Sequence, residues 1–291
     1  MPKPRSLGVC KLTGEFGQFV DSHVIPLALT RLSRTGEKHV EAGIGLGVKM
    51  RANSWYDGNL VTRLGEDILA SIDSRGIEEL RRHRLVWSGW TLDDRLSSDD
   101  LTPPGDHAGF RMVRIARPAV LQVFFLSLLW RAGASARPEF KVVALDDDVL
   151  ENIRQRVLSQ DPGPFEDYPI QLFQLITRGV VHNRTPLLER KHTRNLDGSF
   201  GSEVSYVRFY FDGLVAHIHL GSGIHFSAEY LSTCLRVEEA TTVFAHEFED
   251  SRTATNIREM VEVVERERMA IDTPVNSIAA AVREAWPRKG R

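Results

Sequence analysis

Three histidines in the C-terminal half have a spacing that could bind a metal ion. His217 and His219 stand two residues apart, so on a strand both imidazoles would lie on one face, and His225 follows close behind. Three imidazole nitrogens are sufficient to hold a zinc ion. No acid stands at a spacing typical of a metalloenzyme family, and the same face of the strand could simply be solvated. An enzyme site around these histidines and a solvated strand therefore both stay open, and we favour the solvated strand.

Two other motifs indicate no familiar site. Gly43-Ile-Gly45-Leu-Gly47 lacks the G-K-[S/T] ending of a phosphate loop and the full G-x-G-x-x-G spacing, so it predicts a hairpin or a flexible loop. His246-Glu247 has no second histidine four residues further on, so it is not a zincin motif. Lys49 and Arg51 follow the glycines and are candidates for contacts with nucleic-acid phosphates, which position a protein without reading sequence.

The most specific pattern begins near the N-terminus. Cys10-Lys-Leu-Thr13-Gly14 is followed by Ser22-His23-Val24-Ile25-Pro26, and Asn59-Leu60-Val61 precedes Thr62-Arg-Leu-Gly65-Glu66. A later segment, Phe125–Ala132, reads FLSLLWRA. In this order the segments resemble HNH-type (ββα-metal) nucleases of treble-clef fold. They resemble in particular a bacterial group of HNH-like, endonuclease-related proteins with an S-H-I-I-P motif.

That resemblance implies roles for four residues. His23 would activate a water molecule as the general base of phosphodiester hydrolysis, which needs a pKa near neutrality. Asn59 would hold the loop that carries this base, and Glu66 would supply a metal ligand from the start of the helix. Ser22 stands where the residue before the histidine often binds the catalytic ion, Mg²⁺ or Mn²⁺.

The chain departs from the family pattern at its zinc ligands. Of the four cysteines expected in two C-x-x-C pairs, Cys10 alone remains, and Thr13, Thr62 and Gly65 stand at the other three positions. A structural zinc needs four nitrogen or sulfur donors, which threonine and glycine do not provide. We therefore expect no structural zinc and expect packing to hold the module together. The side chains expected to fill that space are Leu12, Phe16, Phe19, Leu60 and Leu64.

The catalytic metal is expected to bind weakly or not at all, because Ser22 is a poor ligand for ions that prefer carboxylate oxygens. Glu66, Asp67 and Asp73 could supply carboxylates in compensation. Glu66 and Asp67 also fit first-turn acids that the helix dipole stabilises. His23 also fits a structural histidine whose ring bonds the backbone. Both interpretations of these residues stay open.

Composition limits the partners and the compartment. The formal net charge is −2, so contact with nucleic acid, DNA rather than RNA, needs a local basic patch, for which Arg81, Arg82 and Arg84 are candidates. The two cysteines lie far apart and form no disulfide framework, which indicates a reducing compartment, the cytoplasm. The N-terminus has no apolar leader. The apolar run 120–130 is shorter than the ~20 residues that span a bilayer, which predicts a buried core helix and no membrane contact.

The elements that must position these residues indicate an α+β fold. We predict a small treble-clef or ββα-like module at 1–92, a polar linker at 93–109, and a larger α+β domain at 110–291 with helices and an antiparallel sheet. The expected elements are helices at 64–84, 118–131, 168–180, 256–269 and 273–286, a helix to about 158 capped by Asp146–Asp148, a strand at 140–145, and two strands within 204–220 that turn at Asp212-Gly213.

The resemblance and its departures lead to two functional hypotheses. The first is an HNH-nuclease-related protein that acts on nucleic acid in bacterial anti-phage defence, with hydrolysis weakened by the lost ligands. An active member would use Mg²⁺ or Mn²⁺ beside His23. The second is a non-catalytic binding or assembly subunit that contacts a protein partner or a second copy of itself.

Overall fold

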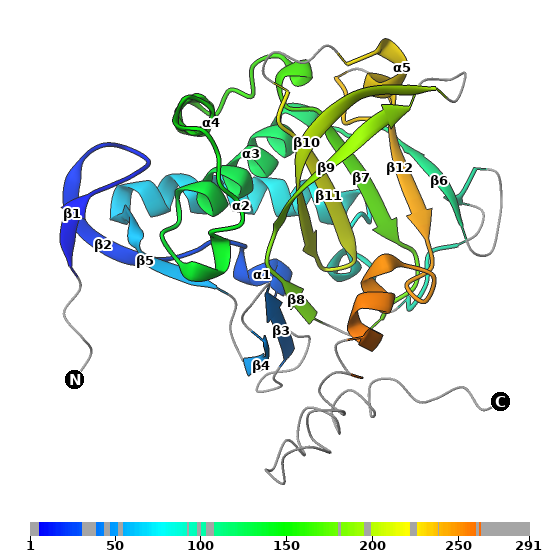
Figure 1. The fold of residues 1–291 in the computed structure, drawn as a ribbon, viewed down its shortest axis with the longest axis horizontal. Coiled ribbons are helices and arrows are strands. Elements are labelled where there is room, and N and C mark those ends of the chain that lie inside the picture. Colours follow the sequence, from blue (N-terminus) through cyan, green and yellow to red (C-terminus); the bar gives the residue numbers. More distant parts are fainter. Residues whose placement is uncertain are drawn as a thin grey trace, which may run out of the picture.

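The computed structural model has an α+β fold (Figure 1). It describes residues 6–30, 39–43, 47–51, 55–91, 93–97, 100–102, 108–179, 182–194, 199–221, 226–237, 239–259 and 262. Within these ranges the strands form three sheets, in the orders β1-β2-β5, β4-β3-β8 and β6-β12-β7-β11-β10-β9.

The N-terminal part is a three-stranded antiparallel sheet that leads directly into a long helix. β5 (Tyr56–Thr62) ends where α2 (Arg63–Arg82) begins, and β2 (Phe16–His23) lies between β5 and the edge strand β1 (Leu7–Val9). The short helix α1 (Leu27–Thr30) follows β2. In this sheet a two-stranded hairpin and a third strand precede the helix, which starts and ends slightly earlier than predicted. The assignment of 1–92 as an HNH-like module stays a prediction.

The glycine stretch forms part of a hairpin, which confirms one of the two forms expected for it. β3 (His39–Gly43) pairs with β4 (Gly47–Arg51) in antiparallel register, with Gly43 opposite Gly47. β3 also pairs in parallel with β8 (His182–Arg184). A small sheet therefore joins the N-terminal part to a strand that lies far along the chain.

The larger sheet is antiparallel except for the pair β12–β7, which is parallel. The hairpin between β10 and β11 turns at Asp212 (φ 49°) and Gly213 (φ 79°), as the sequence predicted, because this turn needs positive φ at both central residues. The strands are β6 (Ala108–Val113), β7 (Ile170–Leu175), β9 (Leu187–Arg194), β10 (Phe200–Phe211), β11 (Leu214–His219) and β12 (Thr241–His246).

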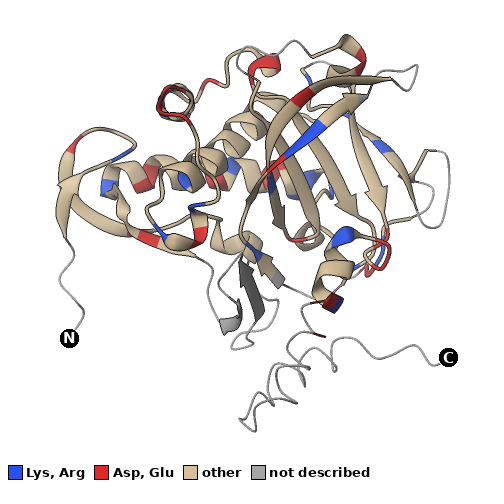
Figure 2. Cartoon of the chain, viewed as in Figure 1, with Lys and Arg blue, Asp and Glu red and all other residues tan. Residues whose placement is uncertain are grey.

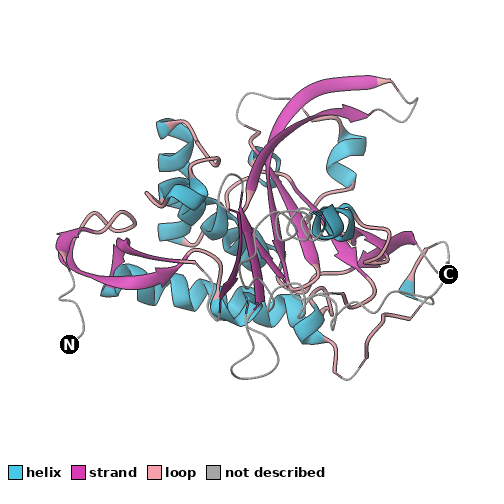
Figure 3. Cartoon of the chain, turned by 60° about the horizontal axis from the view of Figure 1, so that its bottom comes forward, coloured by secondary structure: helices cyan, strands magenta, loops and turns pink. Residues whose placement is uncertain are grey.

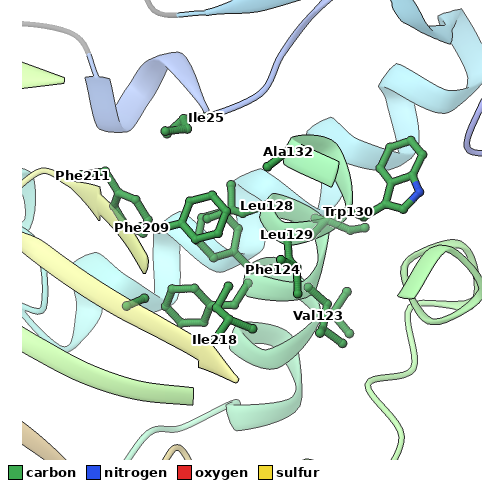
Figure 4. Close-up of a cluster of buried hydrophobic side chains, with 14 of the residues drawn as sticks. Ile25, Val123, Phe124, Leu128, Leu129, Trp130, Ala132, Phe209, Phe211 and Ile218 are labelled. Atoms are coloured by element: carbon green, nitrogen blue, oxygen red, sulfur yellow. The ribbon is translucent and has the colours of Figure 1, made fainter. Parts of the chain in front are cut away.

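The helices gather mainly against one face of this sheet (Figure 3). α3 (Pro118–Ala134) is buried around nearly its whole circumference and packs against α2, α4 (Asp147–Ser159) and β11. Figure 4 shows Phe209, Phe211 and Ile218 of the sheet directed toward Phe124 and Leu128 of α3. The predicted core helix is thus confirmed. Among the described residues, no helix has the length and apolarity needed to cross a bilayer.

Close packing of α2 on α3 depends on a glycine in the middle of α2. A Cβ at Gly76 would lie 2.4 Å from the Phe124 ring. Real Cβ atoms do not approach so closely, so the two helices can touch here only because the side chain is missing. One buried cluster, which extends from Cys10 to Val243, includes residues of both helices, the N-terminal sheet and the larger sheet.

Several predicted elements are wrong. Residues 170–175 form the central strand β7 rather than a helix, and residues 138–140 form a 3-10 turn ahead of the predicted strand 140–145, which is irregular. The helical segment 252–259 starts earlier than predicted, because Ser251 rather than Asn256 caps it: the Ala254 amide donates to Ser251 Oγ at 3.0 Å. The predicted helix 273–286 lies outside the described residues, and the division into two domains stays a prediction.

The predicted linker 93–109 is more structured than its polar composition suggested. Leu96 and Leu101 are buried in a second apolar cluster, and β6 already begins at Ala108. Asp146 does occupy the N-cap position of α4, with Asp147 and Asp148 in the first turn, but its side chain makes no capping hydrogen bond. The acids therefore stabilise α4 through its dipole.

Candidate functional site

The four positions expected to carry zinc ligands lie together. Cys10 Sγ accepts a hydrogen bond from the Thr13 amide at 3.5 Å, and a Cβ at Gly65 would lie 2.7 Å from the same sulfur. Burial acts to raise the pKa of the Cys10 thiol, but hydrogen bonds from Thr13 and Thr62 outweigh it and leave the pKa lowered. The loop after β1 and the start of α2 therefore form one knuckle around a single buried thiol.

The residues in this knuckle do not fit a structural zinc. They offer one sulfur, two hydroxyl groups and a glycine without a side chain, whereas zinc needs four nitrogen or sulfur donors. The sulfur also sits so close to Gly65 that no further side chain fits between them. Hydrogen bonds to Cys10 and side-chain packing, rather than metal coordination, hold these four residues together.

The packing that holds the knuckle differs in part from the prediction. Leu12 and Leu60 are fully buried and Phe19 is nearly so, as expected. Phe16 and Leu64 are exposed, so the prediction for these two side chains is wrong. Contacts with α3 and α4 hold the knuckle instead. Arg154 of α4 donates to the Leu12 carbonyl, and Lys11 donates to the carbonyl of Ala134 at the end of α3.

Ser22 and Glu66 lie close together beside this knuckle, and Arg131 and Asp73 act electrostatically on both Glu66 and His23. Ser22 on β2 is buried, directly opposite Asp57 on β5. Burial raises the pKa of the Glu66 carboxyl, and the nearby Ser22 hydroxyl and the Arg131 guanidinium oppose the shift. Although the two side chains are close, neither Ser22 Oγ nor Glu66 Oε2 has a well-formed hydrogen bond among the described residues. A polar pair is thus buried without full satisfaction.

Arg131 of α3 supplies a buried positive charge at this site. Its guanidinium binds both carboxylate oxygens of Asp73, at 2.6 and 3.0 Å, and donates to the His23 carbonyl at 3.0 Å. It also donates to the hydroxyl of Ser127 one turn earlier on α3, at 3.0 Å. The side chain is 1% exposed, so this cation is held by protein groups rather than by water. The pair with Asp73 is bidentate, the strongest geometry for such a contact.

The surroundings of the His23 imidazole lower its pKa. Burial and the Arg131 guanidinium lower its pKa, although Asp73 and Asp21 act in the opposite direction. The neutral ring therefore predominates at pH 7. The His23 ring is half-buried and meets the exposed Tyr56 ring edge-on, with the two centroids 6.4 Å apart. The Arg137 guanidinium carbon lies over the Tyr56 ring, 5.9 Å from its centroid.

Two of the predicted site residues are engaged elsewhere. Asn59 is exposed, and its Oδ1 accepts a hydrogen bond from Ser6 ahead of the edge strand at 2.9 Å, with no contact to His23 shown. Asp67 lies 3.9 Å from Arg63, and both side chains are about two-thirds exposed. Asp67 therefore fits a surface acid of the first helical turn better than a ligand beside Ser22.

The predicted basic patch is largely paired. At the end of α2, Arg82 binds Glu78 at 2.8 Å, Arg84 binds Asp93 at 2.8 Å, and Arg81 donates to Ser88 and to the Ala28 carbonyl. Figure 2 shows basic and acidic residues alternating along this helix. Lys49 and Arg51 belong to β4, and their side chains lie outside the described part of the structure.

The sequence contained only a weak indication that Arg131 belongs to this site. Ser127 and Arg131 stand one helical turn apart within the segment Phe125–Ala132. The sequence also offered Asp73 as a compensating carboxylate for a metal ion. Their meeting could not be predicted, because the two partners are 58 positions apart.

The histidines of β11 do not form a metal site among the described residues. His217 and His219 do share one face of the strand, as predicted. However, His219 donates through Nδ1 to the Pro169 carbonyl at 2.8 Å, and its Nε2 accepts from the Tyr230 hydroxyl at 2.7 Å. His219 therefore has no nitrogen left for a metal, and since it is fully buried the solvated interpretation is also wrong for it. His225 lies outside the described residues.

These two histidines predict a specific loss of stability in acid. Burial lowers the pKa of His217 to about 2 and that of His219 to about 3. Each ring therefore gains a proton on unfolding, and stability present at neutral pH is lost as the pH falls below about 6.5. We expect His217→Phe to reduce the slope of unfolding free energy against pH by about 1 kcal/mol per pH unit between pH 6 and 4.

Urea denaturation at several pH values measures that slope. Phenylalanine keeps the stacking of position 217 between Phe173 and Tyr206 and removes a nitrogen, Nδ1, that has no partner among the described residues. The control is His192→Phe, at an exposed position on β9, which should leave the slope unchanged. An unaltered slope in His217→Phe would show that His217 is protonated in the folded protein.

No family model, curated protein or solved structure matches the chain. The function is therefore inferred from the residues and geometry of the chain itself.

Proposed function

We propose that the protein is a non-catalytic binding or assembly subunit that contacts a protein partner through an HNH-like module. The observation that supports this most is the guanidinium of Arg131 between Asp73 and the His23 backbone. A metal-dependent nuclease would need a divalent cation beside its histidine. Here a side chain already provides a positive charge next to His23.

The carboxylates near His23 have little capacity left for a metal ion. Both oxygens of Asp73 bind Arg131, and the oxygens of Asp57 accept from the Asn59 amide and from Ser135 at 2.9 and 2.7 Å. Glu66 and Asp21 are further acids near this site, and burial raises the pKa of Glu66, which favours the neutral form that binds cations poorly. Mg²⁺ usually requires one or two ionised carboxylates, so these residues do not fit it well.

The N-terminal hairpin offers a surface that suits a protein partner. Leu7 and Val9 on β1 and Phe16 on β2 are 66%, 58% and 72% exposed, and Val9 lies directly opposite Phe16. β1 is also the edge of its sheet, so its outer backbone groups pair with no other strand that the structure describes. Apolar side chains beside an open edge are typical of strand addition by a partner.

A specific observation also favours a second candidate, the HNH-related nucleic-acid-acting protein. Burial and Arg131 lower the pKa of His23, which favours the neutral ring that a general base needs, and Arg131 and Asp73 act on both His23 and Glu66. Tyr56 is exposed with Arg137 beside it, an aromatic and basic pair on which a nucleobase could stack. Under this proposal the protein would act on DNA in the bacterial cytoplasm, with Mg²⁺ or Mn²⁺, in defence against phage.

Plasmid nicking distinguishes the two candidates. We expect no cleavage by the wild-type protein in Mg²⁺ or Mn²⁺, and no difference between it and His23→Ala. Metal-dependent cleavage that His23→Ala abolishes would reject the non-catalytic proposal and support the nuclease.

The hairpin surface is tested first with a second copy of the chain as the partner. We expect wild-type protein to associate in sedimentation velocity as its concentration rises, and Phe16→Asp to shift the midpoint at least about tenfold higher, since a buried charge opposes the contact. Leu64→Asp, at another exposed apolar position, is the matched control. Equal behaviour of all three proteins would contradict self-association through this hairpin.

A further inference from the structure

A small cavity lies on the face of the large sheet that α3 does not cover. It has a volume of about 150 Å³ and is lined by side chains of five strands and of the segment that follows β12. β7, β10, β11 and β12 contribute aromatic and basic residues, and β9 contributes one acid, Glu189. The helical segment 252–259 closes one end through Arg252. Neither the knuckle at Cys10 nor the group around His23 is part of it.

Positive charge exceeds negative charge at this cavity. Glu189 Oε1 lies 3.6 Å from Arg208 and 3.7 Å from Arg252, and Glu189 Oε2 accepts from the Tyr206 hydroxyl at 2.7 Å. Neither arginine is close enough for a well-formed hydrogen bond to the carboxylate. A single acid is thus shared between two guanidinium groups and a phenol.

A third guanidinium, that of Arg184, lies near this cavity although it is not part of the lining. Arg184 of β8 is partly buried, and its pKa is lowered by burial and then by the positive charges of Arg208 and Arg252, with Glu189 opposing them. No ion pair or hydrogen bond of the Arg184 side chain is found among the described residues. Arg208 is buried and Arg184 is partly buried, and the one carboxylate shared among these groups compensates them only in part, so the arrangement favours a bound anion.

Uncharged groups at the cavity also suit an anion. His217 Nδ1 has no partner in the described structure, although the ring is held between Phe173 and Tyr206 with centroids 4.5 and 4.4 Å away. Ser251 caps the segment 252–259, so Arg252 and Thr253 are its first residues. Backbone amides of a first turn lack partners within the helix and carry partial positive charge.

We propose that this cavity binds the terminal phosphate group of a small phosphorylated molecule. Two guanidinium groups line the cavity and a third lies near it, whereas the lining holds one carboxylate, and this excess of positive charge suits a phosphate group. Arginine is also the side chain whose planar fork best fits phosphate oxygens. The volume is about half that of the smallest usual ligand pockets, so it accommodates the phosphate while the rest of the molecule extends past the exposed Arg252.

Isothermal titration calorimetry with four probes tests this proposal and identifies the source of the phosphate. The probes are inorganic phosphate, AMP, and one oligonucleotide with either a 5′-phosphate or a 5′-hydroxyl end. We expect AMP to bind with one site per chain and inorganic phosphate to compete with it. Equal binding of the two oligonucleotides, with no competition by phosphate, would overturn the proposal, because it would show contact with the nucleic-acid backbone only.

Two variants locate the site, and one variant serves as control. Arg252→Gln and Arg184→Gln are each expected to weaken AMP binding by at least about tenfold, a typical loss for one charged hydrogen-bonding group. Arg190→Gln removes an equally exposed arginine from β9, next to Glu189 in sequence but on the other face of the strand, and should leave binding unchanged.

Thermal unfolding without ligand separates a binding role of Arg184 from a structural one. We expect Arg184→Gln to have an equal or higher melting temperature, because it relieves repulsion among the three guanidinium groups. A large fall in melting temperature would show that Arg184 stabilises the fold and would remove it from the site. AMP binding that survives in both Arg184→Gln and Arg252→Gln, or that is absent from the wild type, would overturn the proposal.

Discussion

Arg131→Met is expected to lower the free energy of unfolding by about 3–5 kcal/mol, because it leaves the Asp73 carboxylate without its partner in a largely buried place. The same substitution removes hydrogen bonds to the His23 carbonyl and to Ser127. Urea denaturation monitored by tryptophan fluorescence measures the effect, and circular dichroism at low urea shows whether the variant is folded.

Arg154→Met is the matched control for this loss. Arg154 also binds an acid, Glu151 at 2.6 Å, and a backbone carbonyl, but Glu151 is about half exposed and remains hydrated when its partner is lost. We expect the control to lose no more than about 1 kcal/mol. The double variant Arg131→Met/Asp73→Leu should recover most of the stability, since replacing a whole buried pair by apolar groups is often neutral. Similar losses in Arg131→Met and Arg154→Met would contradict the role given to Arg131.

Restoring three cysteines is expected to create a tight zinc site. In Thr13→Cys/Thr62→Cys/Gly65→Cys, four sulfurs would surround one point, because these positions already meet at Cys10. Structural zinc sites of this kind contribute on the order of 10 kcal/mol of apparent binding free energy. Part of that is lost here, since Cys10 must turn away from position 65 to make room. Competition with a chromogenic chelator measures the affinity and the stoichiometry, which should be one zinc per chain.

The single variant Gly65→Cys shows whether stabilisation by zinc requires all four cysteines. Its Cβ would meet Cys10 Sγ at 2.7 Å and the Val61 side chain at 2.9 Å, so we expect it to be destabilised by about 1–3 kcal/mol. Zinc should not rescue that variant, whereas it should stabilise the triple variant strongly. A folded triple variant that takes up no more zinc than the wild type would remove the support for a treble-clef origin of the knuckle.

The β10–β11 hairpin and the core helix α3 could be predicted because their signals are local. Asp212-Gly213 provides the positive φ that its turn requires, and the continuous apolar run of α3 has no face that could be solvated. β7 was mistaken for a helix because Gln171 and Gln174 interrupt its apolar pattern. In the fold both glutamines are buried and satisfied by distant partners, Lys191 at 2.7 Å and Arg111 at 2.5 Å.

The candidate sites depended on contacts that sequence spacing does not encode. Ser22, His23 and Glu66 could be grouped through the family resemblance. The cation beside them comes from α3, and the cavity near His217 combines β9, β10, β11 and the segment after β12. Arg208 and Arg252, which stand far apart in the sequence, lie close to the same Glu189 carboxylate there. No periodicity of a single element indicates such a meeting.

Three hydrogen bonds that attach the N-terminal part to later elements of the chain are accepted by backbone carbonyls. Arg154, Arg131 and Arg137 donate to the carbonyls of Leu12, His23 and Tyr56. A carbonyl is present whichever amino acid occupies the position, so these attachments survive substitution of the residues that receive them. Substitutions at these positions would therefore change the side chains of the N-terminal part while its place on the protein stayed constant.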